Sequence, residues 1–330
     1  MFGFTASLAR LPKKLRLAAG VAAFCSAAVA HAAYPDKPIT VVVSYPPGGT
    51  VDLVARLLGP ELEKILGQTV IIENKGGAGG MIGGNYVVRA KPDGYTLLMD
   101  ASNHAQNPAL RPKMAFDTQK DLAPVSLLLK VPNVLVVHPD SSIQTIEDVR
   151  KEDKATDHSL YFASSGPGSA QHLAGELFNV MAGTKLIHVP YKGGGPAMTD
   201  VMGNQVPMMF ASLGSSWTHI GSGKLRAIAV GSEQRSPLLP NIPTIAEEGL
   251  PGYASYEWNG IFAPAGTPED IIEKLSAAFA QAVNAPEVRK RLEDLGSDVI
   301  GSNPQELADF VSSEIAKWKE VARQANISLD

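Results

Sequence analysis

The stretch ITVVVSYPPGGTVDLVARLL, residues 39–58, changes from a strand pattern to a helix pattern within a few residues. Ile39–Val43 is a continuous run of apolar and β-branched residues, which is typical of a strand covered on both faces. Two prolines and two glycines follow, and from Val51 the apolar residues recur at helical spacing until Gly67. This order predicts a strand, a glycine-rich turn and a helix whose first main-chain N–H groups face the turn.

The same alternation of strands and helices continues along the chain. In the first part, we expect strands at 39–43, 69–72 and 95–99 and helices at 51–66 and 81–89. In the second part, we expect strands at 160–163, 186–189, 206–210 and 225–230 and helices at 169–181, from 196 and near 217. Alternation of this kind predicts an α/β protein with parallel, doubly wound sheets in two lobes.

Two connections share one pattern. Residues 131–149 and 258–275 each contain an extended apolar run, a proline, a short turn and a helix. We interpret them as the two crossover segments between the lobes, with a cleft between the lobes. The predicted division is therefore 33–131 for the first part of lobe 1, 132–257 for lobe 2 and 258–330 for the returning part of lobe 1. We expect the helices of this last part at 268–284, 286–295 and 304–325.

The N-terminal 32 residues have the pattern of a cleaved export signal. Basic residues at 10–16 precede the apolar run Leu17–Val29, and small residues lead up to Ala32, where we expect cleavage. The apolar run is too short to span a bilayer, which needs roughly 20 residues. We therefore expect a periplasmic protein whose mature chain does not insert into the membrane.

Composition excludes several classes of site. Cys25 is the only cysteine and lies inside the signal, so the mature chain has no disulfide, thiolate metal site or cysteine nucleophile. Removing the signal leaves 25 basic and 33 acidic residues, a formal charge of −8. Nucleic acid is then not an expected partner, because its binding depends on basic patches. The histidines show no metal-binding spacing, and we expect neither a metal nor a cofactor.

The loops at the predicted strand ends favour an anion site made by the main chain. Ligands of open α/β sheets lie outside the carboxyl ends of the strands. The loops there are rich in glycine, serine and threonine, and their only potential cations are Lys75, His104 and Lys192. Free N–H groups at helix starts attract anions without a cationic side chain. We therefore expect an anion between Gly48–Thr50 and Ser165–Ser169. A small carboxylate fits better than a phosphate, because dinucleotide-binding and P-loop patterns are missing.

Other polar residues near these loops have competing interpretations. Ser102, Tyr191 and Ser212 follow or end predicted strands and are expected to line the cleft. Lys192 is either a ligand partner or an exposed loop lysine. Asp52 more often complements the dipole of its helix than contacts a ligand.

Three further residues lie beside the predicted cleft. His172 is favoured as a packing or loop-bracing residue over a catalytic base for Ser169. Glu257 is a candidate for recognising a ligand amine, and Trp258 either packs at the hinge or forms the cleft wall.

The chain resembles the Bug-type extracytoplasmic receptors of tripartite tricarboxylate transporters over nearly its whole mature length. The similar blocks are SYPPGGTVDLVAR, NKGGAGGMIGG, DGYTLLM, SSGPGSAQHLAGELF, HVPYKGGGPAMTDVMGNQVPMMF, GKLRAIAV and LPNIPTIAEEGLPGY. The resemblance implies a type II periplasmic-binding-protein fold whose cleft holds a small carboxylate through main-chain amides, hydroxyls and ordered waters. It assigns carboxylate binding to Pro47, Gly48, Gly49 and Thr50 in lobe 1, and to Ser164, Ser165, Gly166, Gly168 and Ser169 in lobe 2.

The expected function is therefore solute binding without catalysis. We expect a monomer that captures a mono- or dicarboxylate, aliphatic or aromatic, and delivers it to the membrane permease subunits of the transporter. A ligand-sensing domain for a signalling partner uses the same fold and is the alternative. A serine hydrolase based on Ser165 or Ser169 is less favoured, because the sequence offers no recognisable acid partner for its histidine.

Overall fold

The computed structural model describes residues 34–155, 157 and 160–329, and contacts group Lys37–Asp330 into one unit. The predicted signal over residues 1–32 lies outside the described residues.

One continuous mixed sheet forms the centre of the unit Lys37–Asp330. Its strands are β1 (Ile39–Val43), β2 (Val70–Asn74), β3 (Thr96–Ala101), β4 (Leu122–Val137), β5 (Tyr161–Ser164), β6 (Ile187–Pro190), β7 (Met208–Ser212), β8 (Arg226–Val230), β9 (Tyr256–Pro264) and β10 (Asp298–Val299). They are hydrogen-bonded in the order β2-β1-β3-β9-β4-β7-β5-β6, and β8 and β10 also pair with β4.

The expectation of parallel pairing is confirmed for six of the predicted strands and wrong for β8, which is antiparallel to β4. No strand direction was predicted for the crossover segments that form β4 and β9. Strands β2, β1 and β3 pair in parallel, as do β6, β5 and β7. Strand β9 is antiparallel to β3, and β4 is antiparallel to both β9 and β7. Strands β4 and β9 lie between the two parallel groups and run in opposite directions, so the two groups also run in opposite directions to each other.

Both predicted crossover segments begin in these two long strands. Residues Leu122–Pro132 of β4 pair with β9, and residues Asn133–Val137 pair with β7 and β8. Strand β4 therefore pairs with β9 along its first part and with β7 and β8 along its second part. The predicted boundaries 131/132 and 257/258 fall inside β4 and β9, and the division into lobes stays a prediction.

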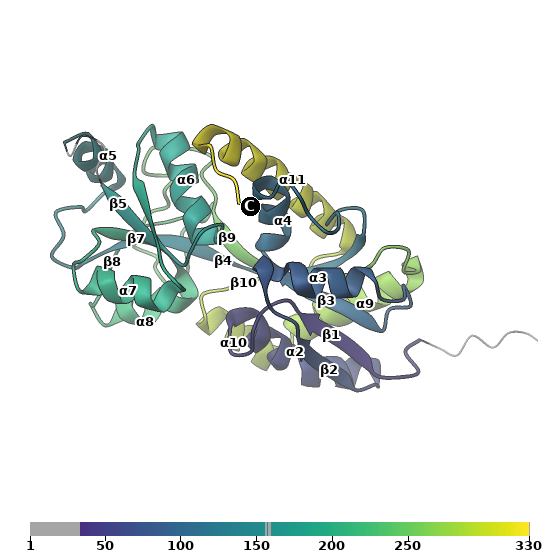
Figure 1. Ribbon diagram of the computed structural model, residues 1–330. Helices are drawn as coiled ribbons and strands as arrows, with labels where there is room; N and C mark the ends of the chain where they lie inside the picture. Colours follow the sequence, from purple (N-terminus) through teal and green to yellow (C-terminus); the bar gives the residue numbers. More distant parts are fainter. Residues whose placement is uncertain (1–33, 156, 158–159, 330) are drawn as a thin grey trace, which may run out of the picture. The chain divides into compact units, whose positions relative to one another are not determined.

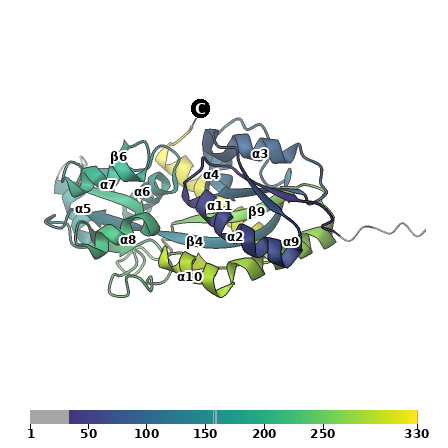
Figure 2. The ribbon, with the colours of Figure 1, turned by 90° about the horizontal axis from the view of Figure 1, so that it is seen from below.

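Helices flank the sheet (Figures 1 and 2). They are α2 (Thr50–Leu66), α3 (Met81–Val88), α4 (Asn103–Leu110), α5 (Ile146–Ala155), α6 (Ala170–Ala182), α7 (Gly194–Met202), α8 (Leu213–Gly221), α9 (Glu269–Val283), α10 (Pro286–Asp294) and α11 (Pro304–Ala325), with a short 3₁₀ turn η1 (Ala78–Gly80). Helix α2 packs with α9 and α10, whereas α11 packs on α4 and also reaches α6.

Hydrogen bonds at the end of α2 and at the start of α11 fix where these two helices end and begin. Gly67 takes a left-handed conformation with φ of 68°, and its N–H donates to the carbonyl of Glu63 to close α2. At the start of α11, the side chain of Asn303 accepts from the N–H of Glu306, whose carboxylate accepts from the N–H of Asn303. The predicted end of α2 and the predicted helix 304–325 are confirmed.

Helix α4 is not among the helices expected from the sequence. Pro108 lies inside the helix, and the N-terminal residue Ser102 provides no side-chain cap. Local sequence therefore disfavours a helix there. Packing of α4 on α11, with Ala105 and Leu110 buried, stabilises it instead.

The hydrophobic core runs through the whole unit. Its largest fully buried side chains include Trp258 on β9, Trp318 on α11 and Phe210 on β7. One connected cluster contains all three, so the two parallel groups of strands share a core around β4 and β9.

Candidate functional site

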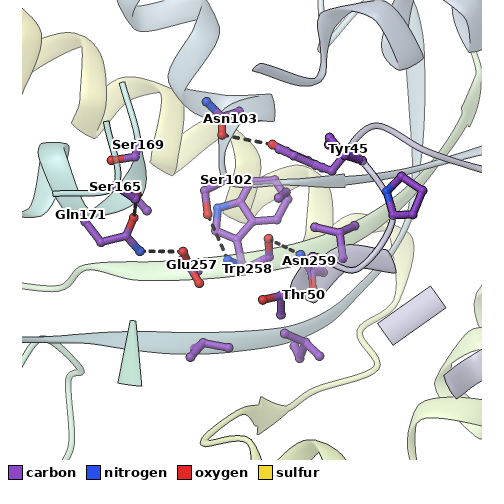
Figure 3. Close-up of a pocket in the computed structure, with 18 residues that line it drawn as sticks. Tyr45, Thr50, Ser102, Asn103, Ser165, Ser169, Gln171, Glu257, Trp258 and Asn259 are labelled. Carbon is purple, nitrogen blue, oxygen red and sulfur yellow. Dashed lines mark hydrogen bonds between the residues drawn. The ribbon is translucent and has the colours of Figure 1, made fainter. Parts of the chain in front are cut away.

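A cavity of about 450 Å³ lies where strands of both parallel groups end against β4 and β9 (Figure 3). It is lined by Tyr45, Pro46, Pro47, Gly49, Thr50, Val51, Ala101, Ser102, Asn103, Leu129, Val131, Ser165, Ser169, Ala170, Gln171, Glu257, Trp258 and Asn259. Six of the residues predicted from the sequence are among them: Pro47, Gly49, Thr50, Ser102, Ser165 and Ser169.

Hydrogen bonds with the side chains of Asp52 and Asn74 fix the turn between β1 and α2. Gly48 has φ of +86°, a conformation that side chains with a Cβ rarely adopt. Its N–H donates to Asp52 Oδ2 at 2.9 Å. Asn74 Nδ2 donates to Asp52 Oδ1 at 2.9 Å and to the carbonyl of Tyr45 at 3.0 Å. The turn is therefore fixed before any ligand arrives.

Asp52 is a charged structural residue. Its burial would by itself raise the pKa, but hydrogen bonds from Arg56, the Gly48 amide and Asn74 outweigh that effect and lower the pKa to about 2. The carboxylate does not line the cavity. It supports the start of α2, in agreement with the preferred interpretation of an acidic residue in the first helical turn.

Helix α2 begins at the cavity without a side-chain cap. Gly49 is its N-terminal flanking residue and has no side chain to cap the helix, and no other side chain of the part of the chain that the structure describes is recorded as accepting from the first N–H groups of α2. Thr50 and Val51, the first two helical residues, line the cavity. Uncapped N–H groups and the positive end of the helix dipole therefore meet at the cavity wall.

The second glycine turn, before α6, differs because its polar groups already have partners. Ser169 Oγ caps α6 by accepting from the N–H of His172 at 3.1 Å and donates to the carbonyl of Gly166 at 2.7 Å. The N–H of Gly168 donates to His172 Nδ1 at 3.1 Å. His172 thus braces the loop, as preferred from the sequence. Its imidazole does not contact Ser169 Oγ as a catalytic base would.

Ser164 is buried behind this turn. Its hydroxyl is 2.6 Å from His188 Nε2 and accepts from the N–H of Gly166 at 3.1 Å. Burial and electrostatic repulsion from the nearby His172 lower the pKa of His188 to about 3, so His188 is neutral at physiological pH. Ser164 and Gly166 shape the turn and do not line the cavity.

A chain of polar side chains enters the cavity from α6. Ser165 Oγ donates to Gln171 Oε1 at 2.5 Å, and Gln171 Nε2 donates to Glu257 Oε1 at 2.5 Å (Figure 3). Gln171 Nε2 also donates to Asn133 Oδ1 at 3.3 Å. Glu257 is the one residue of the cavity lining with a charged side chain. The potential cations named from the sequence, Lys75, His104 and Lys192, do not line the cavity.

Tyr45 and Asn103 form the opposite wall. The Tyr45 hydroxyl donates to Asn103 Oδ1 at 3.0 Å. Burial and the nearby negative charges of Asp100 and Glu257 raise the pKa of Tyr45 well above its usual value, so the hydroxyl remains a neutral donor. Asn103 Nδ2 donates to the carbonyl of Gly168 at 3.3 Å, which joins α4 to the second glycine turn.

The back of the cavity is formed by β9. The N–H of Trp258 donates to Ser102 Oγ at 3.0 Å, and Asn259 Nδ2 donates to the carbonyl of Trp258 at 3.0 Å. Trp258 Nε1 and Asn259 Oδ1 are buried and have no hydrogen-bond partner among the residues that the structure describes. Trp258 therefore belongs to the cavity wall and, through its contact with the ring of Phe310, to the core.

Three further predicted residues of the second part, Tyr191, Lys192 and Ser212, also lie outside the cavity lining. The Tyr191 hydroxyl donates to Asp200 Oδ2 at 2.6 Å, and burial together with that carboxylate raises its pKa to about 12. Ser212 flanks the start of α8, and Lys192 is exposed in the turn before α7. Gly48 and Gly168 also shape their turns without lining the cavity.

The sequence alone did not single out Tyr45, Asn103, Gln171 and Asn259. The position of Gln171 could have identified it as a cavity residue, because a polar side chain two residues after the helix cap Ser169 lies near the start of α6. No such sequence feature marks Asn259, because it is placed by the pairing of β9 with Leu129 of β4.

Among the described residues, the longest apolar stretch of any helix falls short of what a bilayer crossing requires. No three His, Cys, Asp or Glu side chains in the described ranges cluster closely enough to hold a metal ion.

The chain matches the family described as tripartite tricarboxylate transporter family receptor over residues 54–327. Among solved structures, MatC from Rhodopseudomonas palustris with bound malate is 36% identical, with a TM-score of 0.75 over 87% of this chain and 99% of that one. The periplasmic binding protein BugD is 34% identical, with a TM-score of 0.76 over 89% of this chain and 99% of that one.

A third structure, R. palustris Rpa4515 with adipate, is 33% identical, with a TM-score of 0.78 over 89% of this chain and 99% of that one. These similarities confirm the resemblance and the type II periplasmic-binding-protein fold. They also exclude the hydrolase interpretation, because the related proteins are binding proteins and not enzymes. The chain therefore belongs to the receptor family of the tripartite tricarboxylate transporters.

Proposed function

We propose that this protein captures a small carboxylate in the cavity and delivers it, as a periplasmic monomer cleaved near Ala32, to membrane permease subunits. The observation that carries the proposal is the uncapped start of α2 at a cavity whose lining contains no cation. Main-chain N–H groups then replace the arginine or lysine that usually holds an anion. Similar proteins with bound malate and adipate support a carboxylate as the ligand.

In this proposal the ligand carboxylate lies against Gly49 and Thr50, and Pro47 closes one side. Ser165 and Ser169 are proposed to contact the ligand from the second glycine turn, and to donate to it their hydroxyls must first turn away from Gln171 Oε1 and from the carbonyl of Gly166. Each hydrogen bond to a charged group contributes about 1.5–3 kcal/mol. Three or four of them support roughly micromolar affinity after the costs of ordering the ligand.

The remaining predicted residues have supporting roles in this proposal. Gly48, Ser164, Gly166 and Gly168 set the shapes of the two turns, and Ser102 fixes the β9 main chain behind the cavity. Tyr191, Lys192 and Ser212 are proposed to approach the ligand only when the two lobes close.

Closure is proposed to occur about β4 and β9, between 33–131 with 258–330 on one side and 132–257 on the other. A ligand that bridges α2 and α6 favours the closed state through its additional contacts there. Solution scattering should therefore show a smaller radius of gyration with a saturating ligand. Equal dimensions with and without a tight ligand would contradict closure.

The binding proposal is tested by a thermal-shift screen of carboxylic acids on the chain without residues 1–32. A ligand at 100 times its dissociation constant adds about 2.7 kcal/mol to the free energy of unfolding. Thr50→Val removes a hydroxyl at the start of α2 and should weaken binding about tenfold. The matched control is Thr199→Val on α7, whose hydroxyl donates to the carbonyl of Gly195 outside the cavity. Equal losses in both variants, or no stabilising acid in the screen, would contradict the proposal.

A further inference from the structure

The cavity contains one carboxylate of its own. Glu257 lies on β9 between the buried residues Tyr256 and Trp258, and its half-buried side chain points into the cavity beside Gln171 (Figure 3). It stands opposite Val131 of β4 in the sheet, and both side chains line the cavity. A receptor for anions thus presents an anionic side chain to its ligand.

Within the part of the chain that the structure describes, only one oxygen of this carboxylate has a hydrogen-bond partner. Gln171 Nε2 donates to Glu257 Oε1, and among the described residues no cation forms an ion pair with Glu257. Lys130, opposite Trp258 on β4, is turned away, with its Nζ 4.5 Å from the centre of the Tyr256 ring. A carboxylate that is partly removed from water is costly unless it accepts further hydrogen bonds. Glu257 Oε2 is therefore placed to accept from a ligand.

The position of Glu257 also distinguishes the two ends of the cavity. Gln171 is the second residue of α6, so the negative charge of Glu257 lies near the start of that helix. The N–H groups of Gly166, Gly168 and Ser169 in the preceding turn are already bonded within the protein. The start of α2, by contrast, has no side-chain cap. A ligand carboxylate is consequently favoured at α2 and disfavoured beside α6.

We infer that Glu257 selects carboxylates that carry a protonated amino group and disfavours those that carry a second carboxylate. This inference rests on the proposed function, because it requires a carboxylate anchored at α2. The ammonium group donates to Glu257 Oε2, whereas a second carboxylate in the same place faces like-charge repulsion. In this respect the protein differs from its relatives with malate and adipate, whose ligands are dicarboxylates.

The test compares two ligand series of matched length by titration calorimetry on the chain without residues 1–32. One series is the ω-amino acids from β-alanine to 6-aminohexanoate, and the other is the dicarboxylates from malonate to adipate. At the best chain length, the wild-type protein should bind the amino acid at least about tenfold more tightly than the dicarboxylate. Glu257→Gln keeps the size of the side chain and an acceptor for Gln171, and it should abolish or reverse that preference.

Glu273→Gln provides the matched control, because it removes the same charge from an exposed position on α9. It should leave the ratio of the two affinities unchanged within about threefold. The preference of the wild-type protein for amino acids over dicarboxylates is measured without any variant. The inference therefore stays testable even if Glu257→Gln folds poorly.

Two results would overturn the inference. If dicarboxylates bind the wild-type protein as tightly as the amino acids, and Glu257→Gln changes neither affinity, Glu257 only orients Gln171 and the proposed carboxylate receptor stands. If no acid of either series binds but another acid of the thermal-shift screen does, the inference fails and the proposed function stands. If no acid of the screen binds either, both fail.

Discussion

The carboxylate of Asp52 accepts a hydrogen bond of 2.9 Å from the main-chain N–H of Gly48, four residues earlier in the chain. The same carboxylate also accepts from Asn74, at the end of β2, and from Arg56. One buried residue thus fixes the glycine turn, the start of α2 and the neighbouring strand. Among the N–H groups that the structure describes in this turn, Asp52 accepts only from that of Gly48. The N–H groups that follow, at the start of α2, therefore remain available to a ligand in the cavity.

Asp52→Asn should destabilise the protein by about 1–3 kcal/mol at neutral pH, because hydrogen bonds to a charged acceptor are lost. The folded-state pKa of about 2 is lower than the ordinary value of 3.8. The stabilisation is therefore fully present above about pH 4 and is lost as the pH falls towards about 2. Urea denaturation at several pH values measures both effects, and the variant should lack this part of the acid dependence.

Glu61→Gln is the control for this prediction. Glu61 also lies on α2, but its ion pair with Lys64 is at the surface, and its loss should cost less than about 0.5 kcal/mol. Similar losses in both variants would show that Asp52 contributes no more than a surface charge.

Replacement of two helical glycines with alanine should change the free energy of unfolding in opposite directions. A Cβ at Gly175 on α6 would lie 2.2 Å from Cε2 of the buried Phe162 ring, so Gly175→Ala should destabilise by about 1–3 kcal/mol. A Cβ at Gly59 on α2 would meet nothing within 4 Å, and Gly59→Ala should stabilise by up to about 1 kcal/mol. Denaturant unfolding checks both changes, and a loss at Gly59 equal to that at Gly175 would contradict the packing argument.

Ligand binding should change the fluorescence of one tryptophan. Trp258 lines the cavity, whereas Trp217 on α8 does not. A carboxylate that binds in the cavity should therefore change the emission of the wild-type protein and of Trp217→Phe, but not that of Trp258→Phe. Calorimetry would establish that Trp258→Phe still binds. A full emission change in Trp258→Phe would place the ligand elsewhere.

His188 should make the protein less stable as the pH falls. Burial and the adjacent His172 lower its folded-state pKa to about 3, whereas an unperturbed histidine has a pKa near 6.5. Protonation therefore favours the unfolded state, so stability is fully present above about pH 6.5 and declines as the pH falls towards about 3. His188→Gln keeps a partner for Ser164 and should flatten the stability profile between these values.

The control for the His188 prediction is His138→Gln, at the end of β4, where His138 Nδ1 accepts from the N–H of Asp140. This variant should keep the wild-type dependence of stability on pH. An unchanged slope in His188→Gln would assign the acid sensitivity to other groups.

Local sequence was sufficient for the elements whose signals are strong and short in range. The apolar run of β1, the helical spacing that ends at Gly67 and the Ser169 start of α6 all lie where expected. Helix α4 was missed because Pro108 opposes it locally, and only its packing on α11 stabilises it. The antiparallel direction of β4 and β9 was missed because strand direction depends on how distant segments return to the sheet.

The sequence by itself determined that two glycine turns meet helix starts, and so indicated an anion site made from the main chain. It could not distinguish the turns, because both are rich in glycine, proline and hydroxyl-bearing residues and the difference lies in which N–H groups are already bonded. The tertiary structure decided this by placing His172 beneath the turn before α6 and by leaving α2 uncapped at the cavity. It also brought Glu257 to Gln171, 86 residues apart in the chain, through the pairing of β9 with β4.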